Sequence, residues 1–354
     1  MYTIGCDVSK KTSNFAVMDP EGAISQEVKL NNVREDLLAW IRTIPSPKEL
    51  TLEATFNWSL FYELMKNEVD QVHLAHPKKT RIIGEAEIKN DRLDAQVLAR
   101  LTRSRFLPEA YISSQEIREM RSLLRFRCQL VWKRTAVKSE IHALVDRHIF
   151  PTEKPFGLKS LFTQKGVRFL EVLELPGHNR FILDELLCQL REINGHLDQV
   201  ESFIASQPLP REEDSRWLKT VPGMGGKVLH LIVLAEIATI HRFPSPDALI
   251  HYAGLIPKER SSGEKHYRGK LIKDRNTFLQ QALLEAVTGA CFRDKGLKVY
   301  YQQVKKRAGS SAARVATARK LLRCIYGVLK EGRAYRPFLA SDNAQAAARR
   351  PSLR

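Results

Sequence analysis

The sequence predicts an α/β domain at the N-terminus, followed by a chain that is mostly helical. Two observations predict this division. Strand-like segments alternate with helical segments through residues 1–107, and beyond them the apolar residues follow helical periodicity almost throughout. We expect four parts: an α/β domain at 1–107, a helical coiled-coil arm at 108–212, a mainly α domain at 213–336 and a disordered basic tail at 337–354.

Composition and charge narrow the class of protein. The chain of 354 residues is 43% apolar and 27% charged, as is usual for globular proteins, and no run approaches the roughly 20 apolar residues of a membrane span. A strand pattern stands where a signal peptide would be, so we expect a cytoplasmic, nucleoid-associated protein with no membrane partner. Residues 1–107 contain as many acids as bases, so the net charge of +17 lies entirely after them. Such a field attracts polyanions, most commonly nucleic acid.

The first domain has eight predicted elements, in the order three strands, helix, strand, helix, strand, helix. The strands are expected at residues 2–8, 15–19, 24–30, 49–55 and 71–75, and the helices at 32–44, at 58–69 and from Pro77 onward. The first three strands follow one another across short turns, so antiparallel pairing is the simplest arrangement for them.

Four acidic residues stand at the ends of these elements. Asp7 ends the first strand, Glu53 lies near the end of the fourth, and Asp91 and Asp94 begin the last helix. Side chains three residues apart share a helix face. Two carboxylates about 4 Å apart repel by roughly 4 kcal/mol at an effective dielectric near 20, so a partly buried pair needs a proton or a cation between them. Acids in a first helical turn also favour the helix dipole, which is the simpler interpretation of Asp91 and Asp94 alone.

Together, the element order and the four acids resemble an RNase H-like (RuvC-like) domain. Asp7, Glu53, Asp91 and Asp94 are then candidate catalytic residues that bind two Mg²⁺ (or Mn²⁺) ions about 4 Å apart, one on each side of a scissile phosphate. A sugar-kinase or actin-like ATPase has a competing topology, and its first strand also leads with Asp into a phosphate-facing turn. That alternative requires Gly-rich phosphate loops, and the residues after Asp7 contain none.

The arm begins with a strongly basic helix. Ser113 and Glu116 form a capping-box pattern at the start of a helix that runs to about residue 148. Bases outnumber acids by seven to three between residues 116 and 140. Arg118, Arg121 and Arg125 share one helix face, so they are candidate contacts to a nucleic-acid backbone.

The second half of the arm carries a regular apolar seam. From Leu183 to Ile204 the apolar residues alternate in spacings of three and four, which is a period of 3.5 residues. Such a seam pairs either with the basic helix as a hairpin within the chain or with the seam of another subunit.

Beyond the arm, a glycine-rich turn follows an apolar stretch and precedes another. The residues Pro222-Gly223-Met224-Gly225-Gly226-Lys227 resemble the turn of a helix-hairpin-helix motif. Glycine amides and a following helix N-terminus contact a phosphate without reading bases. Gly223, Gly225 and Lys227 are therefore candidate nucleic-acid contacts.

Residues 253–276 form a basic segment with a Ser-Gly pair at an expected loop. This segment has seven bases against three acids. A serine in such surroundings is a candidate nucleophile, because a phosphate would be held beside it. The bases that we expect to hold the phosphate are Arg260, Lys265, Arg268 and Lys273.

At these motifs the chain resembles the transposases of the insertion-sequence 110 type, relatives of the Piv-like invertases and of the bridge-RNA-guided recombinases. The resemblance covers residues 2–107 and 215–293. It rests on the strand Asp7-Val-Ser-Lys, on Leu52-Glu53-Ala54-Thr55, on Lys-Asn-Asp-Arg-Leu-Asp-Ala, on Val-Pro-Gly-Met-Gly, and on Tyr-Ala-Gly-Leu-Ile-Pro with its downstream Ser-Gly. The family usually has Thr where Asn90 stands.

The resemblance implies a recombinase mechanism. Asp7, Glu53, Asp91 and Asp94 correspond to the family's four metal-binding acids, and the catalytic serine corresponds to Ser262, with Ser261 adjacent to it. The implied partners are a structured guide (bridge) RNA and double-stranded donor and target DNA. The implied assembly is a homodimer that pairs into a homotetramer, with the acids of one subunit meeting the serine of another.

Two other functions fit parts of the same pattern. A metal-dependent nuclease acting on branched DNA requires the four acids but no serine intermediate. A basic DNA-organising protein requires neither. Dependence of strand cleavage on a divalent ion separates the enzymes from the binding protein, and a protein–DNA adduct separates the two enzymes.

Overall fold

A computed structural model describes residues 1–83, 91–155, 157–158, 160–208, 211–262 and 265–337. For residues 81–83, 91–92, 259–262, 265–268 and 270 it describes the backbone alone. The chain divides into two compact units, Met1–Ile112 and Ser113–Arg354. The finer predicted division into arm, second domain and tail stays a prediction, and nearly all of the predicted tail lies outside the described residues.

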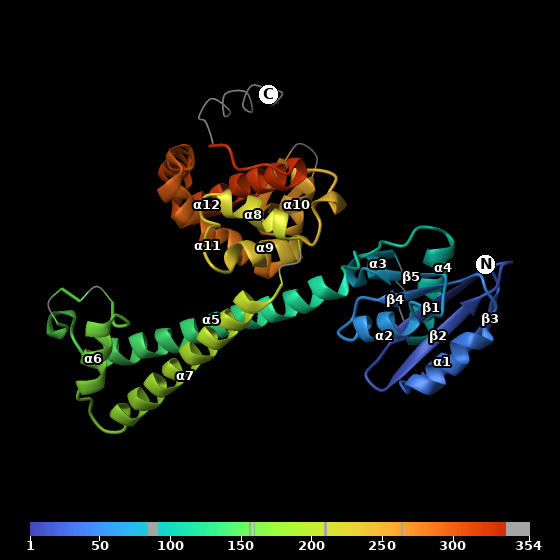
Figure 1. The fold of residues 1–354 in the computed structure, drawn as a ribbon, viewed down its shortest axis with the longest axis horizontal. Coiled ribbons are helices and arrows are strands. Elements are labelled where there is room, and N and C mark those ends of the chain that lie inside the picture. The colour runs from blue at the N-terminus through green and yellow to red at the C-terminus, as the bar shows by residue number, and fades with distance from the viewer. Residues whose placement is uncertain (84–90, 156, 159, 209–210, 263–264, 338–354) are drawn as a thin grey trace. The chain divides into compact units, whose positions relative to one another are not determined.

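The first unit is built on a mixed five-stranded sheet (Figure 1). Its strands are β1 (Tyr2–Val8), β2 (Thr12–Met18), β3 (Ile24–Asn31), β4 (Lys48–Glu53) and β5 (Gln71–Ala75). Their order across the sheet is β3-β2-β1-β4-β5, with β1, β2 and β3 antiparallel and β1, β4 and β5 parallel. The antiparallel pairing predicted for the first three strands is confirmed.

Four helices accompany this sheet. They are α1 (Arg34–Thr43), α2 (Trp58–Met65), α3 (Pro77–Ile83) and α4 (Asp91–Arg103). The predicted element order is confirmed, except that the segment from Pro77 forms two helices, α3 and α4, and residues 84–90 between them lie outside the described residues. Alternation along β1 separates the two faces of the sheet: Ile4 and Cys6 are fully buried in a core with Leu37 of α1 and Phe61 of α2.

The second unit begins with two long helices that lie side by side (Figure 1). They are α5 (Gln115–His148) and α7 (Asn179–Ser206), with α6 (Gln164–Val172) between them in sequence. Leu183 and Leu187 of α7 share a buried cluster with Ile141 and Leu144 of α5. The apolar seam therefore packs within the chain, as the hairpin alternative predicted.

The start of α5 differs from the predicted capping box. Ser114, and not Ser113, is the N-cap residue, and its side chain makes no capping hydrogen bond. The Ser113 hydroxyl is buried and has no hydrogen-bond partner among the residues that the structure describes. The Ser-x-x-Glu pattern is therefore one residue out of register with the start of the helix. Ser113 is buried in the segment that precedes the helix and does not cap it.

The rest of the second unit is mainly helical, with one hairpin. Its elements are α8 (Glu212–Thr220), α9 (Leu229–Ile237), α10 (Pro246–Tyr252), β6 (Pro257–Ser262), β7 (Lys265–Leu271), α11 (Thr277–Arg293) and α12 (Lys295–Glu331), with short 3₁₀ turns at Pro151–Glu153 and Ile240–Arg242. The core lies among α9, α11 and the second half of α12. The segment around the Ser-Gly pair contains the strand pair β6 and β7, and the expected loop at this pair falls on residues 263–264, which lie outside the described residues. None of the helices in the described ranges combines the length and the apolar character needed to cross a membrane.

Candidate functional site

Asp7 and Glu53 lie next to each other at one end of the sheet. β1 and β4 are parallel and their register pairs Cys6 with Leu52, so the next position of each strand brings Asp7 beside Glu53. Both residues are half-buried. Because the carboxyl ends of parallel strands share one edge of a sheet, the two acids are presented at the same edge.

The face that carries these acids is covered by α4. A Cβ atom on Gly5 would come within 1.9 Å of the carbonyl oxygen of Ala95 and 2.7 Å of the amide nitrogen of Ala99. Only glycine permits so close an approach of a helix backbone to a strand. Asp7 is two residues beyond Gly5 on β1, so its side chain is on the same, α4-covered face.

The direction of α4 brings its first turn to the acidic edge. Just beyond the far end of the helix, Arg105 donates to the carboxylate of Glu49, near the start of β4, at 3.2 and 3.0 Å, while Ala95 lies against Gly5 in the middle of β1. The helix therefore runs opposite to β1 and β4. Asp91 and Asp94, at its start, lie toward the strand ends that carry Asp7 and Glu53.

The four acids thus converge in position, although the side chain of Asp91 lies outside the described part. Asp94 is half-buried. Among the side chains that the structure describes, no three acids, histidines or cysteines already form a set that could hold a metal ion. The sheet and α4 thus bring the four acidic residues to the same edge of the sheet. The arrangement of their carboxylates around a metal ion stays a prediction.

The candidate nucleophile lies at the end of a strand. Ser262 is the last residue of β6 and pairs with Lys265 of β7, while Ser261 pairs with His266. The backbone of Arg260 and Arg268 belongs to the same hairpin, and Lys273 is exposed just beyond it. Gly263 lies outside the described residues.

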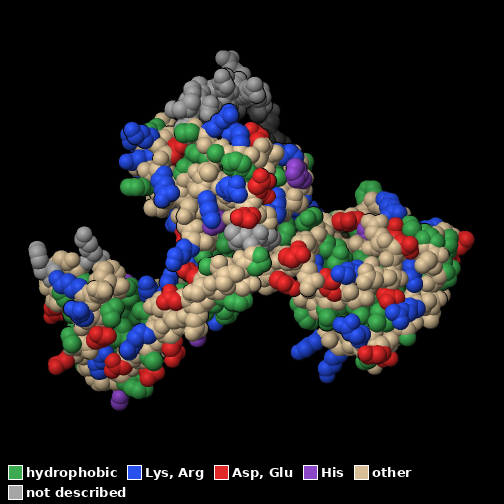
Figure 2. Space-filling model, in the orientation of Figure 1, with side chains coloured by type: hydrophobic (Ala, Val, Ile, Leu, Met, Phe, Trp, Pro, Cys, Tyr) green, Lys and Arg blue, Asp and Glu red, His purple; other side chains and the backbone are tan. Residues whose placement is uncertain are grey.

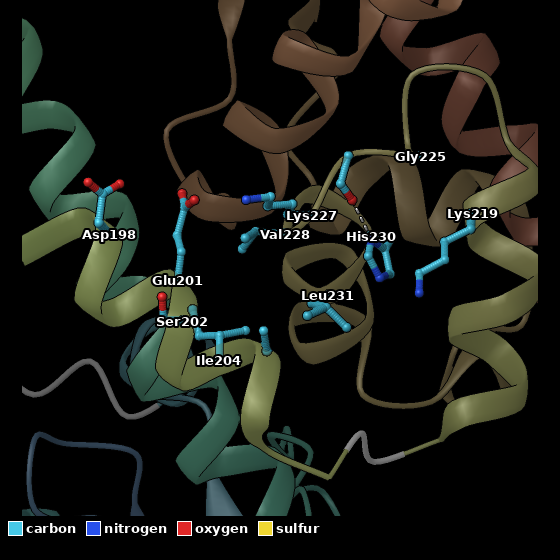
Figure 3. A pocket seen from close by; sticks show the side chains of 12 residues that line it. Asp198, Glu201, Ser202, Ile204, Lys219, Gly225, Lys227, Val228, His230 and Leu231 are labelled. Atoms are coloured by element: carbon cyan, nitrogen blue, oxygen red, sulfur yellow. Dashed lines mark hydrogen bonds between the residues drawn. The ribbon is translucent and has the colours of Figure 1, made fainter. Parts of the chain in front are cut away.

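The glycine-rich turn connects α8 to α9 and borders a cavity of about 740 Å³ (Figure 3). Lys219, Lys227 and the backbone of Gly225 and Gly226 line one side of it. Asp198, Glu201 and Ser202 of α7 line the opposite side. The cavity therefore carries bases on its turn side and acids on its α7 side.

Gly223 of this turn and His230 of α9 have a packing role that the motif did not reveal. Gly223 has a φ of +85°, and a Cβ there would come within 2.3 Å of the carbonyl oxygen of Ala286 in α11. His230 is buried, and its Nδ1 lies 3.0 Å from the carbonyl oxygen of Gly226. Burial, together with the charge of Lys219, lowers the pKa of His230. The predicted phosphate contacts of Gly223, Gly225 and Lys227 stay predictions.

The basic face of α5 is turned largely toward α9. Arg121 donates from Nε and Nη2 to the carbonyl oxygen of Ala235, at 3.0 and 2.9 Å. Arg125 donates from the same two atoms to the carboxylate of Glu236, at 2.7 and 2.8 Å. Arg118 donates to the carbonyl oxygen of Ser113. A stripe open to a phosphate backbone is therefore not supported by the contacts of Arg121 and Arg125, and their nucleic-acid contact stays a prediction.

Glu236 is the buried acid that sequence reasoning missed. Its side chain is 2% exposed, and besides Arg125 it accepts a hydrogen bond from Asn276 Nδ2 at 2.7 Å. Burial by itself lowers the pKa of Arg125, but the hydrogen bond to Glu236 and its charge outweigh this effect and raise that pKa. An acid inside the apolar run Leu-Ile-Val-Leu-Ala-Glu-Ile was the signal that could have indicated this network.

Comparisons with known proteins agree with the two-part organisation. Residues 4–151 match the family model of the DEDD transposase domain of IS110 elements, described as a transposase, and residues 215–302 match the model described as the transposase IS116/IS110/IS902 family. The chain is 22% identical to the transposase for insertion sequence element IS1111A of Coxiella burnetii over 340 residues, which cover 94% of this chain and 91% of that protein.

Two further relatives are also described as transposases. A probable family 20 transposase of Pseudomonas aeruginosa is 22% identical over 340 residues, which cover 94% of this chain and 98% of that protein. A putative transposase of Sinorhizobium fredii is 25% identical over 201 residues, 56% of this chain and 47% of that protein. Matches at both ends of the chain, together with the acidic edge of the sheet, show that this protein belongs to the IS110-type transposases.

Proposed function

We propose that the first unit is an RNase H-like (RuvC-like) catalytic domain, in which Asp7, Glu53, Asp91 and Asp94 bind the metal ions used for DNA strand exchange. The observation that carries this proposal is the convergence of Asp7 and Glu53, on adjacent parallel strands, with the start of α4. The strand order β3-β2-β1-β4-β5, with only the first three strands antiparallel, supports the same fold.

The donor set suits Mg²⁺ or Mn²⁺. All four candidate ligands are carboxylates, the hard oxygen donors that such ions prefer. When bound, the ions supply Lewis-acid stabilisation of charge on the scissile phosphate. Asp7, Glu53 and Asp94 are half-buried, and a cation would offset the repulsion between their carboxylates if these are brought together around one site.

Ser262 is the proposed nucleophile. Its hydroxyl oxygen attacks the phosphorus, a serine–phosphate ester forms as the bond to the leaving deoxyribose oxygen breaks, and that oxygen takes up a proton. A deoxyribose hydroxyl of the new partner strand then attacks the ester and releases the serine. The energy of the phosphodiester is conserved, whereas attack by water would lose it. Arg260, Lys265 and Arg268 are proposed to hold the developing negative charge.

The sequence of the DNA target is proposed to be read by a structured guide RNA, which pairs with donor and target DNA. The net charge of +17, all of it after residue 107, supports binding of nucleic acid through its backbone. The proposed assembly is a homodimer that pairs into a homotetramer, so that the acids of one subunit act with the serine of another.

The metal site is tested with isosteric variants. Asp7→Asn, Glu53→Gln, Asp91→Asn and Asp94→Asn are each expected to abolish strand exchange in Mg²⁺ while the protein stays folded. Removing one clustered charge should also raise the melting temperature of the metal-free protein, and Mg²⁺ should raise that of the wild type only. The control is Asp36→Asn, an exposed acid in the first turn of α1. Normal strand exchange by Asp91→Asn or Asp94→Asn would contradict the assignment.

The role of RNA is tested separately. Purified, RNase-treated protein is expected to bind DNA without sequence preference and to recombine no chosen site, and addition of a structured RNA is expected to restore selectivity. Selective recombination of one site by the RNA-free protein would contradict guidance by RNA and would leave the metal and serine assignments untouched.

A further inference from the structure

The long helix α12 is almost free of acids. It contains ten Lys and Arg residues, and its one acid is Glu331 at its last position. A surface helix usually carries both acidic and basic side chains, because mixed charges keep the protein soluble without strong repulsion between like charges. An excess of nine bases over acids within one helix indicates that part of this helix faces a negatively charged partner.

A kink at Gly309 divides α12 into two halves of different character. Gly309 has a φ of 84° and a ψ of 169°, which are not helical. In the second half the side chains of Leu321, Leu322 and Ile325 are fully buried in the core. In the first half, residues 295–308, only Leu297 and Val304 are buried, seven positions apart. Tyr301 packs against the core beside the line that these two residues form, and Gly296 and Tyr300 are half-buried. The first half is therefore attached along one side, and its other residues are exposed.

Four lysines of the first half form a stripe on one side of this line. At about 100° per residue, Lys295, Lys298, Lys305 and Lys306 fall within an arc of about 100°, which begins about 80° from Leu297 and extends to the opposite side of the helix. All four side chains are exposed. Within the described part of the chain none of them forms an ion pair with a carboxylate. We call these four residues the lysine stripe.

In the second half of α12, unlike in the lysine stripe, basic side chains have polar partners within the protein. Arg323 is paired with Asp247, and Lys330 Nζ lies 3.4 Å from Nδ1 of His241. Figure 2 shows Lys and Arg side chains gathered at the edge of the second unit where Figure 1 draws the first half of α12. Arg323 and Lys330 thus have polar partners within the protein, whereas the four lysines of the stripe are exposed to solvent.

The chemistry of the stripe fits the backbone of a duplex. From Lys295 to Lys306 the helix rises by about 16 Å, which matches about five base pairs of DNA. Lysines act as point charges on phosphates and read no bases. The stripe face includes Gln302 but no aromatic residue, whereas single-stranded nucleic acid is usually held by stacking on aromatic rings.

We infer that the lysine stripe is a binding surface for the phosphate backbone of duplex DNA. It holds DNA in place without selecting its sequence. The inference depends on the protein being a DNA transposase and is independent of the proposed metal ligands and of Ser262.

The test compares two double variants that lower the net charge of α12 by the same amount. The stripe variant, Lys298→Gln/Lys305→Gln, removes two charges from the lysine stripe. The control variant, Arg323→Gln/Lys330→Gln, removes two charges that already have partners in the protein. Binding of a fluorescent DNA duplex by the full-length protein is measured in EDTA over a range of salt concentrations. For the stripe variant we expect the slope of log affinity against log salt to become less steep by about 2, and for the control variant we expect no change. Lys298→Arg/Lys305→Arg is expected to keep the wild-type slope.

Three results would overturn the inference. They are an unchanged slope in the stripe variant, an equal change in the control variant, and a loss confined to an RNA hairpin titrated in parallel. Because the assay measures binding and no strand exchange, none of these results depends on the catalytic proposal. Circular dichroism melting of each variant establishes that the substitutions of exposed side chains leave the fold intact.

Discussion

Arg125 of α5 forms a bidentate ion pair with Glu236 of α9, in which Nε donates to Oε1 at 2.7 Å and Nη2 donates to Oε2 at 2.8 Å. The Glu236 side chain is 2% exposed, so this pair is shielded from water on the side of the acid. A buried charge is tolerated only when it is paired and hydrogen-bonded. The pair therefore fixes the long helix of the arm against the core of the second unit.

We expect Arg125→Met to destabilise the protein by about 2–3 kcal/mol, because Glu236 then keeps only Arg121 and Asn276 as polar partners. Urea denaturation measures the loss. Arg125→Lys should recover only part of it, since an ammonium cannot donate in a fork. Asp184→Asn, in the exposed pair with Arg180, is the control and should change little. Equal midpoints of urea denaturation for the wild type and Arg125→Met would mean that the ion pair between Arg125 and Glu236 contributes nothing to stability.

Gly5→Ala should damage both stability and catalysis. The new methyl group would lie 1.9 Å from the carbonyl oxygen of Ala95, so β1 and α4 must move apart. We expect a destabilisation of about 2–4 kcal/mol and a loss of strand exchange of about 100-fold, because the acids on the two elements separate.

The control for this prediction is a glycine with free space around it. Gly195 on α7 has no atom within 4 Å of a built Cβ, so Gly195→Ala should stabilise the helix by about 0.5–1 kcal/mol and leave activity unchanged. Full activity in Gly5→Ala would show that the close approach of α4 is not needed to position the acids.

His230 predicts how stability responds to acid. Burial lowers the pKa of His230 from the ordinary value of 6.5. Below that pH, His230 is therefore protonated more readily in the unfolded chain than in the folded chain. Stability from this residue is therefore present above pH 6.5 and is lost as the pH falls. In His230→Asn the free energy of unfolding should decline less between neutral pH and about pH 5 than in the wild type. Parallel decline in both proteins, measured by urea denaturation at each pH, would contradict this prediction.

Ser262→Ala should still bind DNA and RNA but form no covalent protein–DNA complex that survives denaturation, because the attacking oxygen is gone. Ser261→Ala is the matched control and should retain the adduct. Denaturing gel electrophoresis with labelled DNA measures it. If the two variants behave in the opposite way, Ser261 is the nucleophile. If both recombine normally, no serine of this pair forms the intermediate.

Much of the first unit could be predicted from the sequence. β1 and β5 have the predicted bounds, because short runs of β-branched and apolar residues between polar turns leave little freedom in where a strand begins and ends. The positions of Asp7 and Glu53 near strand ends followed from these bounds.

The sequence by itself thus determined most elements of the first unit, the acids at the ends of its strands and the family resemblance. Only the tertiary structure decided that Arg121 and Arg125 face Glu236, that Gly223 packs against Ala286 and that Ser262 ends a strand. Periodicity identifies which residues share a face, because it is a local property of the backbone. It does not identify what that face meets, because the partner is brought there by residues about 60 to 110 positions away in the chain, whose approach depends on the packing of the whole core.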